Sequence, residues 1–329
     1  MTAESGAQAI AAFIEGVLPG GHAVPEIALL HEMMGDYPRR PGKSLRGRLT
    51  LLSAEAHGGS RQAALPLAAA VELFQSWVLI HDDIEDGSEE RRGRPALHRL
   101  HGMPLALNAG DALHVLMWRV VLESGTEGAA SEFLDMIAET AEGQHMDVAW
   151  VERRRWDLTE GDYLEMVRRK TARYTVVSPL RLGALAAGRQ PDGRLTAAGR
   201  DLGVAFQVRD DVLNLVGDRE AYGKEIGGDL LEGKRTLILA HLLAGLPQGE
   251  RAEVIAALQL PRGEKTPEQV QWITGLAVER GSVAHAQRVA DEHARRGLAL
   301  LEETLAPLPG RAAAGAVLDA VRDLATRQA

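Results

Sequence analysis

Three carboxylates, Asp82, Asp83 and Asp86, are close neighbours in the segment HDDIEDGSEERRG, which covers residues 81–93. At about 100° per residue of an α-helix, Asp82 and Asp86 lie about 40° apart and Asp83 and Asp86 about 60° apart, so all three point into one sector. Like charges this close repel, and each carboxylate resists ionisation unless a cation lies among them. Mg2+ fits such a site because it prefers oxygen ligands and is commonly held by one or two carboxylates together with substrate phosphates. The alternative is a solvated acidic helix end that binds nothing.

A second pair, Asp210 and Asp211, ends another largely apolar segment, GVAFQVRDDVLNLVGD. On a helix these two carboxylates share one stripe with Gln207, Asn214 and Asp218, and the remaining positions are mostly apolar. Charges on such a helix are expected to be paired or to hold a metal, because leaving them unpaired in an apolar surrounding is costly. Two similar acidic helix ends could face each other across one cavity.

Basic residues near these segments could bind phosphate. Arginine binds phosphate through two parallel hydrogen bonds, and lysine adds a mobile point charge. Any one of these residues could instead be a surface cation, and the sequence contains no G-x-x-x-x-G-K-[ST] P-loop. The candidates are Arg91 and Arg92, Lys170 with its neighbour Thr171, and Lys224 and Lys234 in the glycine-rich stretch GKEIGGDLLEGKRT.

The elements that must position these residues are predicted to be helices. Glycine and proline clusters separate long segments rich in Ala, Leu, Glu and Arg, and apolar residues recur at helical spacing, as at Leu67, Val71, Phe74 and Val78. Strand-type alternation is hard to find over more than four residues. We therefore expect an all-α protein, and because no linker divides the chain we expect a single large helical domain over residues 1–329.

Composition excludes several classes of protein. The 329 residues are 45% apolar and 4% aromatic, which is enough to bury a large core. A net charge of −9 argues against nucleic-acid binding. The absence of cysteine excludes disulfides and thiolate metal sites, and it agrees with a cytoplasmic location. With no uninterrupted apolar run of about 18 residues and no signal-peptide pattern, we expect neither a membrane span nor processing.

Seven short segments, in order, resemble the trans-isoprenyl diphosphate synthases of the polyprenyl synthetase family. The resemblance runs from about residue 40 to residue 240. It implies an all-α fold around a deep central cavity, usually as a homodimer. It also implies a prenyltransferase that joins isopentenyl diphosphate to an allylic diphosphate. The segments are GKSLRGR (42–48), HDDIEDGSEERRG (81–93), NAGDAL (108–113), GQHMD (143–147), KT (170–171), FQVRDDVLN (206–214) and GKEIGGDLLEGKRT (223–236).

The resemblance also implies roles for single residues. Two or three Mg2+ ions would bridge the carboxylates to the allylic diphosphate. The departing diphosphate is our candidate for the base that removes the final proton. The metal set is Asp82, Asp83, Asp86, Asp210, Asp211 and Asn214; the allylic diphosphate set is Arg91, Lys170 and Lys234; the isopentenyl diphosphate set is Lys43, Arg46, Gln75 and Arg92; Lys224 is a further substrate-binding residue; and Thr171 and Gln207 would lie near the reacting carbons.

Four positions depart from the usual family pattern. Ser44 replaces a basic residue, and Gly47 stands where proline is common. Gln75 replaces a histidine, so it can donate a hydrogen bond but no charge. Asn214 replaces an aspartate, as in geranylgeranyl-type members, and its amide oxygen can still accept a bond from metal-bound water.

Product length is expected to depend on residues four and five positions before Asp82. On an ideal helix Val78 lies about 40° from Asp82 and Trp77 about 140°, so geometry alone leaves the pocket floor open. From the resemblance we predict that Trp77 caps the cavity and gives a C20 product ahead of C15. The alternative is an indole packed in the core.

Two other functions remain open. A class I terpene cyclase, or another prenyl transferase, also ionises a prenyl diphosphate, but Lys43, Arg46 and Arg92 would then have no second diphosphate to bind. A catalytically silent partner subunit should lack part of a metal motif, and this chain has carboxylates in both acidic motifs. We further expect His81 to be structural, and Asp111 and Asp147 to orient basic residues or cap helices.

Overall fold

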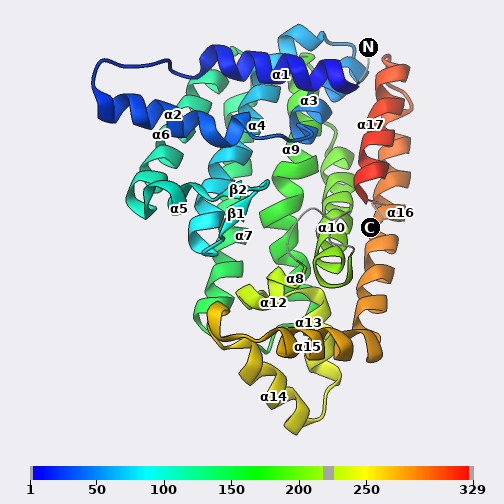
Figure 1. The fold of residues 1–329 in the computed structure, drawn as a ribbon. Helices are drawn as coiled ribbons and strands as arrows, with labels where there is room; N and C mark the ends of the chain where they lie inside the picture. Colours follow the sequence, from blue (N-terminus) through cyan, green and yellow to red (C-terminus); the bar gives the residue numbers. More distant parts are fainter. Residues whose placement is uncertain (1–2, 218–225, 326–329) are drawn as a thin grey trace. The chain divides into compact units, whose positions relative to one another are not determined.

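The protein is all-α, as predicted (Figure 1). The structure is a computed structural model that describes residues 3–217 and 226–325, so Lys224 and Asp218 lie outside the described residues. In the described part, β-structure is limited to one antiparallel hairpin of β1 (Glu90–Arg91) and β2 (Arg94–Pro95). The hairpin leaves no alternating pattern in the sequence, because each strand is only two residues long.

Contacts divide the chain into two compact units, and each is described by itself. Unit 1 comprises residues 1–135, 178–195 and 303–320, and unit 2 comprises residues 136–177, 196–302 and 321–329. The prediction of a single domain stays a prediction. Unit 1 contains α1 (Ala3–Val17), α2 (Pro25–Arg39), α3 (Leu45–Ala56), α4 (Arg61–Glu85), α5 (Leu97–His101), α6 (Met103–Glu123) and α9 (Ser178–Ala186).

Unit 2 contains the remaining elements, and some helices have residues in both units. The helices shared by both units are α7 (Ala129–Glu152), α10 (Gly193–Val216), α16 (Ser282–Leu305) and α17 (Arg311–Ala325). Those within unit 2 are α8 (Glu160–Val167), the π-helix η1 (Arg168–Val177), α12 (Gly228–Glu232), α13 (Leu237–Gly245), α14 (Gln248–Leu258), the 3-10 turn η2 (Arg262–Glu264) and α15 (Pro267–Glu279).

In unit 1 the core is built around α4, which packs against α1, α3, α6 and α9. The helix starts at an N-cap, where the Ser60 hydroxyl accepts a hydrogen bond from the Ala63 N–H at 3.1 Å. Leu67, Val71 and Phe74 are fully buried on it, and each such side chain contributes roughly 1.5–3 kcal/mol through burial. This packing fixes the end of α4, which carries Asp82 and Asp83.

Two helices, α4 and α6, are long and apolar enough to span a membrane when judged by length and composition alone. Within their most apolar windows, 56% of the α4 residues and 44% of the α6 residues are buried inside the protein. Buried helices of a protein core pass the same test, so these two helices do not indicate a membrane span.

In unit 2 two glycines let the helices around the π-helix approach closely. A Cβ on Gly143 of α7 would lie 2.2 Å from the Lys170 nitrogen, and one on Gly203 of α10 would lie 2.3 Å from the Ala172 Cα. Only glycine fits at such crossings. The π-helix, a form often found at functional sites, therefore holds Lys170 and Thr171 against both neighbouring helices.

Candidate active site

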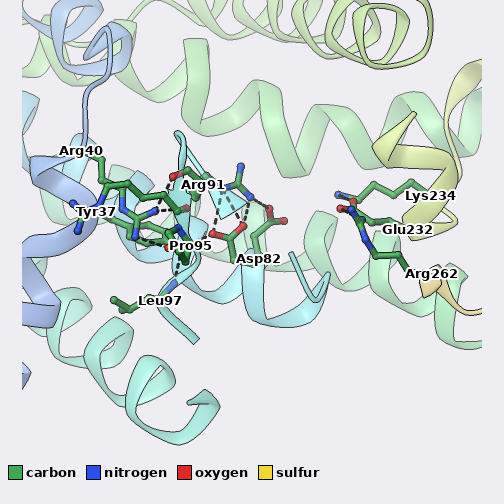
Figure 2. Close-up of polar contacts among 11 residues, drawn as sticks. Tyr37, Arg40, Asp82, Arg91, Pro95, Leu97, Glu232, Lys234 and Arg262 are labelled. Carbon is green, nitrogen blue, oxygen red and sulfur yellow. Dashed lines mark hydrogen bonds and ion pairs between the residues drawn. The ribbon is translucent and has the colours of Figure 1, made fainter. Parts of the chain in front are cut away.

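The first acidic cluster lies at the end of α4, where Asp82 and Asp83 occupy the last turn and Asp86 is the C-cap. Asp83 is fully buried and accepts a 2.5 Å hydrogen bond from the Tyr37 hydroxyl. The Arg91 Nε donates to both Asp83 oxygens, at 2.9 and 3.2 Å, and a terminal nitrogen of Arg91 lies 3.4 Å from Asp82 (Figure 2). Protein donors therefore occupy Asp83, whereas Asp82 and Asp86 are partly exposed.

Arg91 is an ion-pair partner of two of the three carboxylates in this cluster, Asp82 and Asp83. Burial alone would lower the pKa of Arg91, but the hydrogen bonds and charge of Asp83 outweigh it and raise that pKa above its usual range. Burial and the adjacent Asp83 also raise the pKa of Tyr37, which stays a neutral donor. Arg91 is thus a permanent cation held beside the acidic helix end.

The hairpin presents two of the predicted phosphate-binding arginines in succession. Its register pairs Glu90 with Pro95 and Arg91 with Arg94, and its two turn residues, Arg92 and Gly93, have φ of 53° and 73°. Left-handed residues at both positions match the twist of a tight two-residue hairpin. Arg91 therefore points back to the carboxylates, while Arg92 is exposed at the turn.

The segment GKSLRGR forms the start of α3, with Lys43 exposed and Arg46 buried. Gly47 donates its N–H to Glu72 at 2.8 Å, and a Cβ there would lie 2.8 Å from the Ala68 carbonyl. Proline could neither donate this bond nor fit this space, which explains the departure from the family pattern. Burial raises the pKa of Glu72, while the Gly47 hydrogen bond and the charges of Arg46 and Arg92 oppose that rise.

Trp77 belongs to an aromatic cluster between α4 and α6. Its ring stacks on His114 at 4.0 Å, and the His114 Nε2 accepts a hydrogen bond from the Trp118 Nε1 at 3.0 Å. The stacking agrees with either role for Trp77, a cap on the cavity or a packed core residue, so the role of Trp77 in product length stays a prediction. Gln75 and Val78 lie partly buried on the same helix.

His81, on α4, fits the structural role expected for it. Its Nε2 lies 3.5 Å from a carboxylate oxygen of Asp111, and burial lowers its pKa.

The second acidic cluster is a chain of hydrogen bonds in unit 2. Asp211, which is 6% exposed, accepts bonds from the Tyr163 hydroxyl at 2.6 Å and from the Gln207 Nε2 at 2.8 Å. The Gln207 Oε1 in turn accepts a bond from the Thr171 hydroxyl at 2.9 Å. The structure thus connects three of the predicted residues, Thr171, Gln207 and Asp211.

Two of the predicted cations, Lys170 and Lys234, have carboxylate partners in unit 2. Lys170 donates to Asp147 at 2.6 Å, which confirms the expected orienting role of Asp147. Lys234 lies 3.5 Å from Glu232, whose other oxygen lies 3.3 Å from Arg262 (Figure 2).

Asn214 binds the backbone at the start of α12 through its side-chain oxygen. That oxygen accepts a hydrogen bond from the backbone N–H of Asp229 at 3.0 Å, and the Asn214 carbonyl accepts one from Gly227 at 2.6 Å. Asn214 therefore positions the start of α12, and any contact with metal-bound water stays a prediction.

Sequence reasoning missed Tyr163 and Asp229. Burial raises the pKa of Asp229 well above its ordinary value, and the charge of Asp211 adds to this effect. Burial and the charge of Asp210 likewise raise the pKa of Asp211 to about 7, although Tyr163, Gln207 and Lys234 oppose this. Asp229 is half-buried and stands within the segment GKEIGGDLLEGKRT, in which the sequence analysis singled out only the lysines.

The acidic ends suit Mg2+ better than a metal that needs a complete protein cage. Over residues 3–217 and 226–325, no three His, Cys, Asp or Glu side chains gather closely enough to hold an ion. Mg2+ usually keeps several waters and takes one or two carboxylates plus substrate phosphates, so partial sets of oxygen ligands fit it. Asp82 and Asp210 belong to different units, and their approach across one cavity stays a prediction.

Comparisons with known proteins agree with these features. The polyprenyl synthetase sequence model matches residues 27–276. The short chain isoprenyl diphosphate synthase of Methanothermobacter thermautotrophicus is 37% identical over 272 residues, covering 80% of this chain and 82% of that protein.

Solved structures are also similar. Geranylgeranyl pyrophosphate synthetase from Pyrococcus horikoshii has a TM-score of 0.87 and 27% identity, and the match covers 99% of this chain and 97% of that one. Geranylgeranyl pyrophosphate synthase from Corynebacterium glutamicum, complexed with isoprenyl diphosphate and magnesium, has a TM-score of 0.81 and 27% identity, covering 99% and 98%. The chain belongs to the polyprenyl synthetase family.

Proposed function

We propose that this prenyltransferase joins isopentenyl diphosphate to an allylic diphosphate in an Mg2+-dependent reaction and releases a C20 product ahead of a C15 one. The observation that carries the proposal is the pairing of each acidic helix end with a phosphate-binding group: Asp83 holds Arg91, and Asp211 is linked through Gln207 to Thr171, the neighbour of Lys170. The similar proteins from P. horikoshii and C. glutamicum are geranylgeranyl pyrophosphate synthases, which supports C20.

In the proposed site the metal would be held by carboxylates of both acidic ends. Bound Mg2+ supplies positive charge that stabilises the leaving diphosphate. The magnesium in the C. glutamicum structure supports this assignment. The proposed ligands are Asp82, Asp83, Asp86, Asp210, Asp211 and Asn214, for two or three ions.

The cations of the chain would hold the two diphosphates. Arg91, Lys170 and Lys234 would neutralise the allylic diphosphate, and Lys224, which lies outside the described residues, is proposed with them. Lys43, Arg46, Gln75 and Arg92 would bind isopentenyl diphosphate. Donors fixed in place before the reaction stabilise developing charge without reorganisation, and Thr171 and Gln207 are already fixed to each other.

An exposed apolar face supports a homodimer. On α6, Met103, Leu107, Val115 and Leu122 are 42–66% exposed, and Leu134 of α7 is 59% exposed. Apolar patches of this kind are typical of protein interfaces. A Leu122→Glu protein should have a lower mass than wild type by light scattering, whereas an unchanged dimer would show that this face is not the interface.

A cytoplasmic location of the protein is also proposed, because the sequence contains no cysteine.

Product analysis tests the function. Labelled isopentenyl diphosphate with each allylic primer should give linear prenyl diphosphates that end at C20, measured by mass spectrometry. Geranyl diphosphate alone should remain unchanged. Conversion of geranyl diphosphate to a hydrocarbon without isopentenyl diphosphate would instead favour a terpene cyclase.

The same assay tests the cavity cap. A Trp77→Ala protein should extend the product beyond C20, because the stacked indole no longer closes the pocket. An unchanged product length would leave Trp77 as a packed core residue.

A further inference from the structure

Arg40, which follows the last residue of α2, is a buried cation for which the proposed chemistry has no use. It is only 3% exposed, and its Nε donates to Asp36 at 2.6 Å. Its guanidinium also lies over the Tyr37 ring, 4.3 Å from the centroid. A buried arginine must find acceptors for its N–H groups, because an unsatisfied buried charge is costly.

The remaining acceptors of Arg40 are all main-chain carbonyls of the hairpin. One terminal nitrogen donates to the carbonyls of Arg91, at 2.7 Å, and Arg94, at 3.3 Å. The other terminal nitrogen donates to the carbonyl of Pro95 at 2.9 Å (Figure 2). In return, the Arg40 carbonyl accepts a hydrogen bond from Arg92 at 3.2 Å.

The hairpin needs such support. Its strands have two residues each, and an isolated two-stranded hairpin is at best marginally stable. Arg92 is a non-glycine residue with φ of 53°, a conformation that persists only when its surroundings hold it. The neighbouring Tyr37 adds a second tie, because its hydroxyl donates to Asp83 and accepts the Leu97 N–H at 3.3 Å.

We propose that Arg40 is a positioning residue that fixes the hairpin and so sets the direction of Arg91 and Arg92 together. This rests on the proposed function, in which Arg91 binds the allylic diphosphate and Arg92 binds isopentenyl diphosphate. One buried guanidinium therefore couples the affinities for both substrates without touching either. Arginine is required because only its planar fork can reach three carbonyls at once, whereas lysine offers a single nitrogen.

The test compares Arg40→Gln with Arg39→Gln, a matched control in which the neighbouring exposed arginine loses its ion pair with Glu15. Dissociation constants are measured by calorimetry for isopentenyl diphosphate and for a non-ionisable thio-analogue of geranyl diphosphate. Arg40→Gln should weaken both by about tenfold or more, and Arg39→Gln should weaken neither. Equal binding by Arg40→Gln and Arg39→Gln would overturn the proposal, and so would weakening of one ligand alone.

Amide hydrogen exchange gives a readout that does not depend on ligands. In Arg40→Gln, exchange should speed up at residues 89–97 and stay as in wild type on α4 before Asp82. Arg40→Lys, which retains the charge, should show faster exchange at the same residues and intermediate binding. Uniformly faster exchange over unit 1 in both variants would reduce Arg40 to a general stability residue and overturn the proposal.

Single-site variants separate this proposal from the function beneath it. Arg92→Gln should weaken isopentenyl diphosphate only, and Arg91→Gln the allylic analogue only. If both bound like wild type, the proposed roles would fail, and the coupling by Arg40 with them. If both weakened as expected while Arg40→Gln bound normally, the positioning role alone would fail.

Discussion

The two acidic helix ends carry the same Asp-Asp pair but differ in the partners of the buried carboxylate. At the end of α4, Asp83 is buried against the cation Arg91 and the hydroxyl of Tyr37. In the last two turns of α10, Asp211 accepts hydrogen bonds from two neutral groups, Tyr163 and Gln207, and burial with the nearby Asp210 raises its pKa to about 7 although the charge of Lys234 opposes this. The buried carboxylate of the first end thus has an arginine as its partner, whereas Asp211 at the second end is held by hydrogen-bond donors, and a bound cation would favour its ionised form.

This difference suggests a division of labour. At the end of α4, Asp83 holds the proposed phosphate-binding residue Arg91 in place before any ligand is bound. At the second end a divalent cation would lower the repulsion among Asp210, Asp211 and Asp229.

The largest effect is expected for Asp82→Ala, which removes a proposed metal ligand that the first end leaves partly exposed. Turnover should fall by at least about 100-fold, the scale of losing one electrostatic contact to the transition state, with an unchanged circular dichroism spectrum. Steady-state kinetics measures the change, with Asp135→Ala, an exposed carboxylate elsewhere in unit 1, as control. Wild-type turnover would refute the metal assignment.

Arg91→Gln should cost the most stability, because it leaves the buried Asp83 without its cation. Breaking such a pair costs about 3–5 kcal/mol in the free energy of unfolding, measured by urea denaturation. Tyr163→Phe at the second end removes one neutral donor and should cost only about 1 kcal/mol. Equal losses at the two ends would contradict the contrast between them, and Arg99→Gln provides a surface control.

Metal binding at the second end should release protons. Since the pKa of Asp211 is raised to about 7, this carboxyl is mostly protonated below pH 7 in the absence of metal, and Mg2+ must displace the proton. Apparent Mg2+ affinity should therefore fall as pH drops from 8 to 6, by up to about tenfold per pH unit below the pKa. Calorimetry in two buffers of different ionisation enthalpy detects the release, and Asp211→Asn should abolish it; a pH-independent affinity would argue against the assignment.

Asn214→Asp should have the smallest effect. The added carboxylate brings a further negative charge to the second end, so the free energy of unfolding without metal should fall by about 1 kcal/mol. The loss should shrink when Mg2+ is added, as measured by thermal unfolding with and without the ion. A loss that Mg2+ leaves unchanged would indicate that Asn214 serves only to hold Asp229.

The helices and the motif positions could be predicted from the sequence, whereas the side-chain partners of the motif residues could not. Helical periodicity at Leu67, Val71 and Phe74 predicted the helix that is α4, and the motif order correctly predicted the family. The partners of Asp83 could not be foreseen, because Tyr37 comes from another helix and Arg91 returns through a hairpin of two-residue strands. Asp147 was predicted to orient a basic residue, and Lys170 is that residue.

Buried groups show the same limit. Arg40 and Glu72 lie outside the chemical motifs, and periodicity gave no sign that Arg40 would be buried, and Glu72 half-buried, near the phosphate-binding arginines. Gly47 was visible as a departure from the family, but its reason, a hydrogen bond to Glu72 and a tight contact with Ala68, exists only in the folded chain.

The most direct test is a crystal structure grown with Mn2+ in place of Mg2+ and a non-ionisable allylic diphosphate analogue, with metal positions taken from anomalous scattering. The account predicts one diphosphate linked through metal ions to Asp82 on one side and to Asp210 on the other. Metal ions confined to one helix end, or two ends that bind separate ligands, would contradict it.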